Sequence, residues 1–401
     1  MARPVIAAVA ILRLVAAAAA APGDGCTSEL TTLCVLRNVC IEQTAPGATT
    51  WTQYGVGDDA AHSHVQATTF QRYRNVTVAA SATAFDAAAA DARALFRGTS
   101  LFMYMYQMHL PHFMEEALAT LPFFARPESF GLAAPPARQL FFLGHVSPPG
   151  YYKYDYHKAL QSLYTNVSSE WDSGILAADA FNAGSWDAFW SKAALLGDVV
   201  RPAGAKMCFE AVALNDDGMW HHSVRDARFL RQQAARQWGL DYSRSDMCVL
   251  QRKGTRAIAN LDELVAMLKA RTGKCVRVFE MERRPPHAQA ALMASCGVLV
   301  TPHGANEANM VFMPEDATLV ELMPVAYDGA VDYFKKLAAS CGIRGHHAVI
   351  PYERLHSGDG CLANFGSVAY LDCLKELGKC VWCYKQSNMT VAVEDLAGIA
   401  F

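Results

Sequence analysis

The stretch from Val298 to Leu322, VLVTPHGANEANMVFMPEDATLVEL, decides the fold that we expect for this chain. It begins with an apolar run and continues through a tight polar turn at 301–305. A helix-like segment follows at 306–312, and a second apolar run occupies 318–322. Short apolar runs bounded by glycine and proline are typical of buried strands. The order strand, turn, helix and strand indicates a parallel α/β sheet.

The turn in this stretch is a candidate ligand site. His303, Gly304 and Ala305 lie where the first strand ends and the helical segment begins. In open parallel sheets, ligands bind beyond the carboxyl ends of the strands. Glycine allows a ligand to approach the backbone closely, and exposed N–H groups at a helix start favour an anion. We therefore expect an anion at this turn.

Flanking segments extend the same pattern into a domain over residues 245–350. Four strands are expected at 247–250, 275–279, 298–300 and 318–322, with three helical segments between them. A helix at 331–341 and a strand near 347–350 follow. This alternation predicts a doubly wound α/β domain.

Two helices near this domain carry sequence signals of their own. Asn260 to Glu263 resembles a capping box that begins a helix. The preceding helix, at 225–238, carries four arginines, and such a basic face is usually solvated, so we assign no site to it.

A basic loop follows the first strand of this domain, with Arg252, Lys253 and Arg256 around Gly254. Arginine grips phosphate oxygens through two parallel hydrogen bonds, and lysine adds a point charge. Such a loop suits a diphosphate, although a basic surface loop has the same composition. The turn at His303 is expected at the same edge of the sheet, and two phosphate-friendly loops at one edge favour the diphosphate.

Several motifs together resemble glycosyltransferase family 61, which includes plant xylosyl- and arabinosyltransferases and animal enzymes that add N-acetylglucosamine to protein-linked sites. The clearest is a strand followed by HGA (303–305), an asparagine, F-x-P (312–314) and V-E-L-x-P (320–324). An Arg-x-x-x-Arg-x-x-x-Asn element (252–260) also matches. PHFMEE (111–116) is similar to a further family segment, although Leu110-Pro111 departs from the usual Asn or Gly.

The resemblance implies an α/β protein with two Rossmann-like domains that face a cleft, the GT-B arrangement. The acceptor-side domain would span 26–225, and the nucleotide-sugar domain would span 245–350. Such an enzyme transfers N-acetylglucosamine, xylose or arabinose from a UDP-sugar to a glycan or protein acceptor, with inversion. No metal is expected as cofactor, and the chain contains no Asp-x-Asp triplet of the kind that holds one.

Three further residues near the His303 turn are candidates for the donor site, and the resemblance supports the role of Glu321. Glu321 is expected to accept hydrogen bonds from ribose hydroxyls, the alternative being a strand-end carboxylate in water. Glu307 and Asn309 lie near the same helix start and are expected to reach the donor sugar or base.

An inverting transfer needs a general base, which must come from the domain opposite the donor. The candidates are Glu116, Glu115 and His112, in that order, which share one face of a helix. The alternative for His112 is an ordinary residue at the start of that helix.

The ends of the chain indicate the secretory pathway. Residues 1–21 read as a signal peptide, with an uncleaved type II membrane anchor as the alternative. The 12 cysteines include clusters near both ends, which suggests disulfides in an oxidising compartment. In the cysteine-rich tail, 351–401, a structural disulfide is favoured over a redox or zinc role for Cys380-Val-Trp-Cys383. Glycosylation sequons occur at Asn75, Asn166 and Asn388.

Composition narrows the function classes further. The chain of 401 residues is 52% hydrophobic and 18% charged, which is typical of globular proteins. A net charge of −3 gives no general attraction to nucleic acid. The absence of a G-x-S-x-G elbow counts against an α/β hydrolase. The resemblance to family 61 and the secretory features together imply a glycosyltransferase in the Golgi or endoplasmic reticulum lumen, with a secreted, inactive sugar- or nucleotide-binding protein as the alternative.

Overall fold

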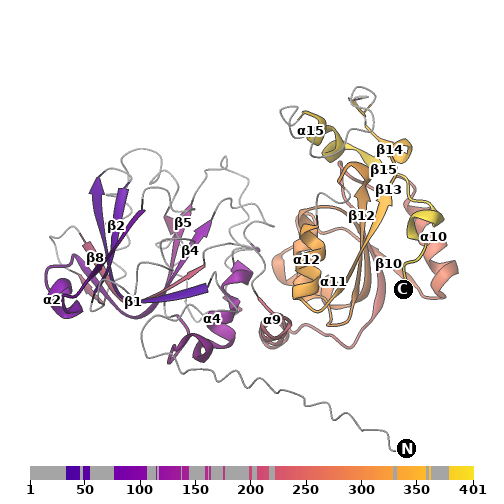
Figure 1. The fold of residues 1–401 in the computed structure, drawn as a ribbon. Helices are drawn as coiled ribbons and strands as arrows, with labels where there is room; N and C mark the ends of the chain where they lie inside the picture. The colour runs from indigo at the N-terminus through magenta and orange to yellow at the C-terminus, as the bar shows by residue number, and fades with distance from the viewer. Residues whose placement is uncertain are drawn as a thin grey trace, which may run out of the picture.

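The protein is described by a computed structural model, shown in Figure 1. It describes residues 33–45, 48–54, 76–105, 114, 117–136, 138–143, 159–160, 162–163, 175–176, 198–200, 206–215, 222–327, 332–357, 361–362 and 379–401. The predicted signal segment 1–21 and the base candidates His112, Glu115 and Glu116 lie outside these residues. Within them, none of the helices combines the length and the apolar character needed to cross a bilayer.

Two sheets lie side by side, and the first is built from residues 33–215 (Figure 1). Its main order is β3-β2-β1-β8-β4-β5-β6, with β7 pairing to β4. β1 pairs antiparallel with both β2 and β8, whereas β4 pairs parallel with β8 and β5. The sheet is therefore mixed and departs from a fully parallel Rossmann-like sheet. The strands and helices of this part of the chain are β1 (Leu33–Ala45), β2 (Ala48–Tyr54), β3 (Val76–Ser81), α2 (Phe85–Ala89), β4 (Ala94–Met105), α4 (Leu121–Ala125), η1 (Pro127–Phe130), β5 (Arg138–Leu143), β6 (Ile175–Leu176), β7 (Val199–Val200) and β8 (Lys206–Asn215).

Aromatic side chains fill the centre of this first sheet. Phe209 on β8 stacks on Phe96 of β4 at 4.3 Å between ring centroids and meets Phe102 edge-on at 5.1 Å. Trp51 on β2 extends the group to Phe102 at 5.4 Å. A disulfide between Cys40 and Cys208 ties β1 to β8 at directly paired positions.

The second sheet has five strands in the order β10-β9-β11-β12-β13, and all of its pairs are parallel. This confirms the expected α/β fold of the region. Its elements are β9 (Asp246–Leu250), α10 (Leu261–Thr272), β10 (Val276–Phe279), α11 (Pro286–Ala294), β11 (Cys296–Pro302), η2 (Ala305–Phe312), β12 (Thr318–Pro324), η3 (Val325–Tyr327), α12 (Tyr333–Ser340) and β13 (Arg344–Ile350). The segment at 305–312 is a 3-10 helix rather than an α-helix.

Both faces of this sheet are covered, as a doubly wound domain requires. Successive strand residues point to opposite faces, so Leu299 packs with α11 and α12 while Val300 packs with α10. The C-terminal segment joins α10 on the second face through buried side chains such as Tyr384 and Met389. Its elements are η4 (Tyr352–Arg354), β14 (Leu355–His356), α15 (Lys379–Gln386), β15 (Asn388–Met389) and η5 (Val393–Leu396).

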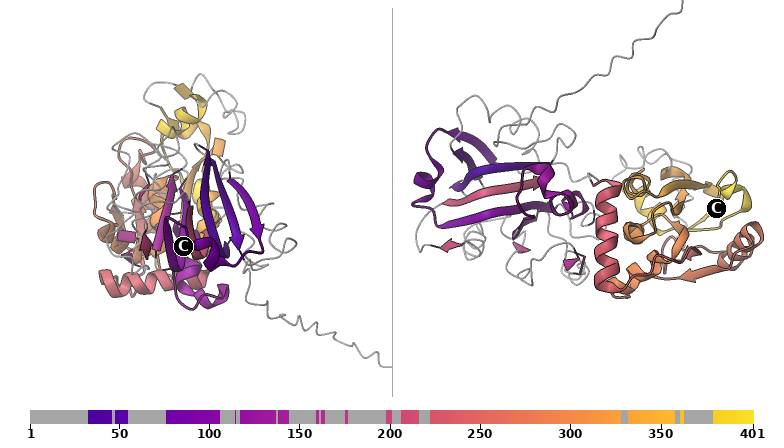
Figure 2. Two further views of the ribbon diagram at one scale, coloured as in Figure 1. Left: turned by 90° about the vertical axis from the view of Figure 1, so that its left-hand side faces the viewer. Right: turned by 90° about the horizontal axis from the view of Figure 1, so that it is seen from below.

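The helix α9 (Val224–Trp238) lies between the two sheets in Figure 1 and in the right-hand view of Figure 2. Its start is capped by Ser223 and Asp226, and Asp226 also accepts hydrogen bonds from Arg126 beside α4. One apolar cluster continues from the first sheet through α4 and α9 to the second sheet. The helix therefore joins the two halves by packing as well as by chain connection.

The prediction that the arginines of α9 are solvated is wrong for Arg231. Arg231 is only 5% exposed, and its guanidinium donates to the carbonyls of Val311 and Cys341 at 3.0 and 2.7 Å. These carbonyls satisfy Nε and Nη2 of the buried guanidinium, whereas its Nη1 has no acceptor among the described residues. Arg231 therefore fastens α9 to the ends of η2 and α12.

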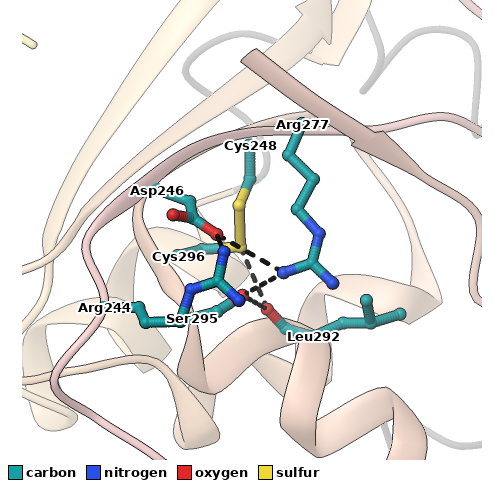
Figure 3. The surroundings of a disulfide bond; sticks show 7 residues. All are labelled: Arg244, Asp246, Cys248, Arg277, Leu292, Ser295 and Cys296. Carbon is teal, nitrogen blue, oxygen red and sulfur yellow. Dashed lines mark hydrogen bonds and ion pairs between the residues drawn. A yellow bond between two sulfur atoms is a disulfide. The ribbon is translucent and has the colours of Figure 1, made fainter. Parts of the chain in front are cut away.

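The disulfides of the described residues lie in the sheets as well as in the C-terminal segment. Cys248 on β9 is bonded to Cys296 on β11, in the surroundings drawn in Figure 3. Cys361 is bonded to Cys383, which confirms a structural disulfide in the tail rather than a redox or zinc role for that cysteine. Among the described residues, Cys275 and Cys341 are free.

Candidate functional site

The strand order of the second sheet places two loops side by side. β9 lies between β10 and β11, and its connection leaves toward α10 on one face, whereas α11 leads into β11 from the other face. Such a reversal of strand order opens a crevice at the carboxyl ends of the two central strands. The loop after β9 carries Arg252 and Arg256, and the turn after β11 carries His303 and Gly304. The fold thus brings together the two segments that the sequence predicted at one sheet edge.

Gly304 is the point of contact between these loops. Its backbone is extended, with a φ of 163°, so the conformation itself suits any residue. A Cβ added here, however, would overlap Nη1 of Arg252 and lie 3.1 Å from Cζ of Arg252 and 3.5 Å from Cζ of Arg256. Glycine at this position therefore lets both guanidinium groups pack against the backbone.

The two arginines form a desolvated pair of like charges. Burial and the neighbouring charge of Arg252 together lower the pKa of Arg256 to about 10. Burial also lowers the pKa of Arg252, against the opposing effect of Glu282 and Glu307. Nε of Arg256 is buried with no hydrogen-bond acceptor among the described residues, whereas Nε of Arg252 donates to the Thr255 carbonyl at 3.2 Å. A buried donor without an acceptor is costly, and an anion would relieve both the lost bond and the repulsion.

Arg256 also has an unusual backbone conformation. Its φ is +56°, in the left-handed region that side chains other than glycine rarely occupy. Strained residues of this kind persist where the surrounding structure fixes them, and they cluster at ligand sites. The loop therefore holds the backbone of Arg256 in an unfavourable conformation that directs its guanidinium toward Gly304.

Lys253 lies on the same loop but faces other partners. Its ammonium group pairs with Glu280 at 2.6 Å, and its side chain is 68% exposed. The structure therefore does not place Lys253 within the buried arginine pair, and its contact with a phosphate stays a prediction.

Three adjacent strands supply a row of titratable side chains next to the arginines. Nδ1 of His303 lies 2.5 Å from Oε1 of Glu321, and Nε2 of His347 lies 3.2 Å from Oε2 of Glu321. The parallel register places Glu321 of β12 opposite His347 of β13. Glu321 is 1% exposed, so the alternative of a carboxylate in water is wrong. Its contact with a ribose stays a prediction.

The environment keeps Glu321 ionised. Burial acts to raise its pKa, but the hydrogen bonds and charges of His303 and His347 outweigh burial, and the pKa is lowered overall. An ionised Glu321 accepts a hydrogen bond from Nδ1–H of His303. The ring of His303 is fixed further by Tyr327 and Phe334, each 5.5 Å away between ring centroids.

Glu307 and Asn309, on η2, are both buried and turned inward. Oε1 of Glu307 accepts from the backbone N–H of Gly304 at 2.5 Å, which occupies one of the donors expected to face an anion. Asn309 donates to Gln289 and to the Asn306 carbonyl, so its amide helps to hold η2 against α11. Contact of either residue with the donor sugar or base stays a prediction.

The pKa of Glu307 is shifted in the opposite direction from that of Glu321. Burial raises it well above its usual value, the negative charge of Glu321 raises it further, and Gly304, Arg252 and Arg256 offset only part of the shift. Two buried carboxyl groups this close favour one proton between them, because both cannot ionise without strong repulsion. Because its pKa is the one that is raised, Glu307 is the carboxyl group of the two that keeps a proton to higher pH.

The same cluster has the composition of a cation site. One ligand atom each from His303, Glu307 and Glu321 lies within 4.8 Å of the others. A histidine and two carboxylates suit a divalent ion. Here, however, Nδ1 of His303 is bonded to Glu321, and two guanidinium groups already bring positive charge to the neighbouring turn. The cluster therefore fits an ion poorly, and independence from metal stays a prediction.

Two features of the site were missed by sequence reasoning. His347 was placed on a strand but given no role, because its partner Glu321 is adjacent only through strand pairing. The C-terminal segment was treated as a separate tail, yet Asn388 and Met389 hydrogen-bond to the loop that carries Arg256. No local pattern reveals a contact between segments 131 residues apart.

Comparison with known proteins supports the resemblance in the motifs. The sequence model of the glycosyltransferase 61 family matches residues 110–320. A segment of 106 residues is 36% identical to beta-1,2-xylosyltransferase XAX1 of Oryza sativa subsp. japonica. This alignment covers 26% of the present chain and only 18% of the rice protein. From the family match over the arginine loop, the His303 turn and the strands that carry them, we conclude that the chain belongs to glycosyltransferase family 61.

Proposed function

We propose that this protein is a glycosyltransferase that takes a sugar from a UDP-sugar and transfers it to a glycan or protein acceptor. One observation carries the proposal: Arg252 and Arg256 pack together against Gly304, and Nε of Arg256 is buried without an acceptor. Like charges in such a position are unfavourable unless an anion completes the group. A diphosphate has the charge and the oxygen atoms for two guanidinium groups.

The same arrangement supports catalysis of sugar transfer. Negative charge builds on the diphosphate as its bond to the sugar breaks, and preorganised cations aimed at that charge lower the barrier. Arg252 and Arg256 supply these cations in place of a metal ion. Because Glu321 holds Nδ1 of His303, the opposite ring nitrogen, Nε2, is the atom of His303 for the departing phosphate. We therefore assign the departing phosphate to Nε2 of His303, with Glu321 as the residue that orients the ring.

The remaining parts of the mechanism rest on the family. An inverting transfer requires a base to remove the proton of the acceptor hydroxyl. Glu116, Glu115 and His112 remain the candidates, from the half of the chain that also forms the first sheet. In a GT-B arrangement this half faces the nucleotide across a cleft.

The donor sugar and the compartment are further proposals. The rice relative is named as a xylosyltransferase, so UDP-xylose is the first donor to test, followed by UDP-arabinose and UDP-N-acetylglucosamine. Three disulfides, Cys40–Cys208, Cys248–Cys296 and Cys361–Cys383, suit an oxidising compartment. We therefore place the enzyme in the lumen of the secretory pathway, in the Golgi or the endoplasmic reticulum.

Two measurements test the proposal. UDP binding is measured by calorimetry, and UDP release is then followed for each donor with EDTA present. We expect UDP to bind and at least one donor to be hydrolysed slowly without acceptor in the presence of EDTA. Binding without release for every donor and acceptor would favour the inactive binding protein, and release that requires a divalent ion would contradict the metal-free mechanism.

A further inference from the structure

The loop that carries Arg256 needs support from outside itself. Residues 251–257 form no helix or strand, and only a single bridge follows at Ile258. Arg256 nevertheless holds a left-handed conformation, with a φ of +56°. Such a conformation costs about 1 kcal/mol or more for a side chain other than glycine. Contacts from neighbouring segments must therefore fix the backbone on both sides of Arg256.

One side of the support comes from within the loop. The amide of Gln251, at the end of β9, makes two hydrogen bonds to Ile258. Its Oε1 accepts from the Ile258 N–H at 2.9 Å, and its Nε2 donates to the Ile258 carbonyl at 2.9 Å. These bonds close the base of the loop but do not reach the residue that follows Arg256.

The other side comes from the C-terminal segment. Oδ1 of Asn388 accepts from the N–H of Ala257 at 2.9 Å. The N–H of Met389 donates to the Ala257 carbonyl at 2.9 Å, and the N–H of Ala259 donates to the Met389 carbonyl at 2.7 Å. These three bonds secure the backbone immediately after Arg256.

A second pair of bonds extends the same clamp. The side chain of Asn260 donates to the Val391 carbonyl and accepts from the Val391 N–H, both at 2.9 Å. Asn260 makes no capping bond to its own helix, so the predicted capping box is wrong, and its amide serves the C-terminal segment instead. Asn260, the asparagine of the Arg-x-x-x-Arg-x-x-x-Asn element, thus has a structural role in this chain.

The clamp is itself firmly anchored. Met389 is fully buried in the apolar cluster below α10, and Cys383 is tied to Cys361 by a disulfide. Leu355 and His356 pair with Met389 and Asn388 in a two-stranded sheet. Because the segment is held by its own packing, its hydrogen bonds restrict the movement of the loop.

We propose that Asn388 and Met389 support the donor site from the C-terminal segment and that Asn388 is a positioning residue, which fixes the guanidinium of Arg256 for the diphosphate by holding the N–H of Ala257. This inference rests on the proposed function and extends it to the C-terminal segment. Asn388 also begins the sequon Asn388-Met389-Thr390, so a glycan at this residue is the competing explanation of any effect.

The test compares three variants in the full-length protein. Asn388→Ala removes both the acceptor for Ala257 and the sequon. Thr390→Ala removes the sequon but keeps Asn388. Arg271→Ala removes two other bonds to the C-terminal segment, to the carbonyls of Leu396 and Ile399, far along the chain from the loop. UDP affinity is measured by calorimetry, and amide hydrogen exchange is followed in the peptide 251–260.

We expect Asn388→Ala to lower UDP affinity about tenfold and to speed exchange in 251–260, since loss of one backbone hydrogen bond releases Arg256. Thr390→Ala and Arg271→Ala should retain the affinity of the parent, although Arg271→Ala lowers the melting temperature. If Asn388→Ala does not fold, Asn388→Ser gives the same comparison with a shorter polar side chain.

Unchanged affinity in the Asn388 variant would overturn the inference, as would an equal loss in Thr390→Ala or in Arg271→Ala. The first of these equal losses would assign the effect to a glycan, and the second to general stability of the segment. A parent protein that does not bind UDP contradicts the proposed function itself, and that failure appears in the parent rather than in the comparison of variants.

Discussion

Arginines gather near both ends of β9, and the two ends differ in how those arginines are satisfied. At the amino end, Arg277 donates to Ser295 at 2.8 Å and lies 3.4 Å from Asp246, which also pairs with Arg244 at 2.9 Å (Figure 3). The disulfide Cys248–Cys296 joins the strands beside this group.

At the carboxyl end, two positive charges lie together instead. Arg252 and Arg256 pack against Gly304, and the pKa of Glu307, the carboxyl group that η2 brings beside them, is raised well above its usual value. An arginine held by close ion pairs is a structural element, whereas two desolvated arginines whose charges repel each other are poised for an anion. A basic residue is therefore informative about function only when its partners are known. Four predictions test this contrast, from the largest expected effect to the smallest.

Removal of the disulfide should damage stability more than binding. Replacing Cys248 and Cys296 by serine frees a loop with a sequence separation of 48 residues. Chain entropy predicts a loss of about 4 kcal/mol in the free energy of unfolding. The carboxyl end keeps its own contacts, so UDP affinity measured below the unfolding transition should change less than about threefold. A large loss of affinity in the folded variant would show that the two ends are not independent.

Removal of one arginine from each end should separate binding from stability directly. Arg256→Ala should lower UDP affinity roughly 100-fold, because it removes a partly buried cation from the diphosphate. Arg277→Ala, the matched control, loses its bond to Ser295 and should cost about 1 kcal/mol of stability with UDP affinity unchanged. Both are checked by calorimetry and urea unfolding. If Arg256→Ala binds UDP as the parent does, the loop does not belong to the site.

A methyl group at the contact point should disturb the carboxyl end alone. In Gly304→Ala the new Cβ would overlap Nη1 of Arg252, and the φ of 163° allows alanine without backbone strain. The flexible guanidinium can move aside, so stability should change by less than about 1 kcal/mol. UDP affinity should fall about tenfold, because the shifted group no longer matches the phosphate. Parent-like affinity in this variant would mean that Arg252 need not touch the turn.

Much of the second sheet could be predicted from the sequence because its signals are local. The apolar run Val298–Val300 lies inside β11, and the run Thr318–Leu322 lies inside β12, each bounded by a proline or glycine turn. The two basic and glycine-containing loops were expected at one sheet edge, since parallel strands all end on the same side. The juxtaposition of Arg252, Arg256 and Gly304 follows from that rule.

The remainder depends on neighbours that a linear pattern does not contain. Glu321 is buried because β13 brings His347 beside it, and the sequence alone gives no register between strands. The capping signal at Asn260 was misread because Val391 competes for the same side chain. In the first sheet, β1 pairs antiparallel with β8, which comes much later in the chain, so a local pattern could not show that the sheet is mixed.

The smallest effect concerns the proton on Glu307. Its pKa is raised by burial and by Glu321, so the folded protein keeps this proton after the unfolded chain has lost it near pH 4.5. Above that pH the parent loses stability as pH rises, by at most about 1.4 kcal/mol per unit for one proton, until the raised pKa is passed. Glu321, whose pKa is lowered, acts in the opposite sense and loses its contribution as pH falls below its usual range.

In Glu307→Gln the free energy of unfolding should therefore no longer fall as pH rises above about 4.5. The loss of stability at low pH, which comes from Glu321, should remain. Glutamine keeps an acceptor for the Gly304 N–H and has no proton to lose. Urea unfolding between pH 5 and pH 8 should give a stability curve for the variant that is flatter than that of the parent. Parallel curves would place the proton elsewhere in the cluster. In that case Glu307 would be an ionised partner of the arginines, and the carboxyl end would resemble the amino end after all.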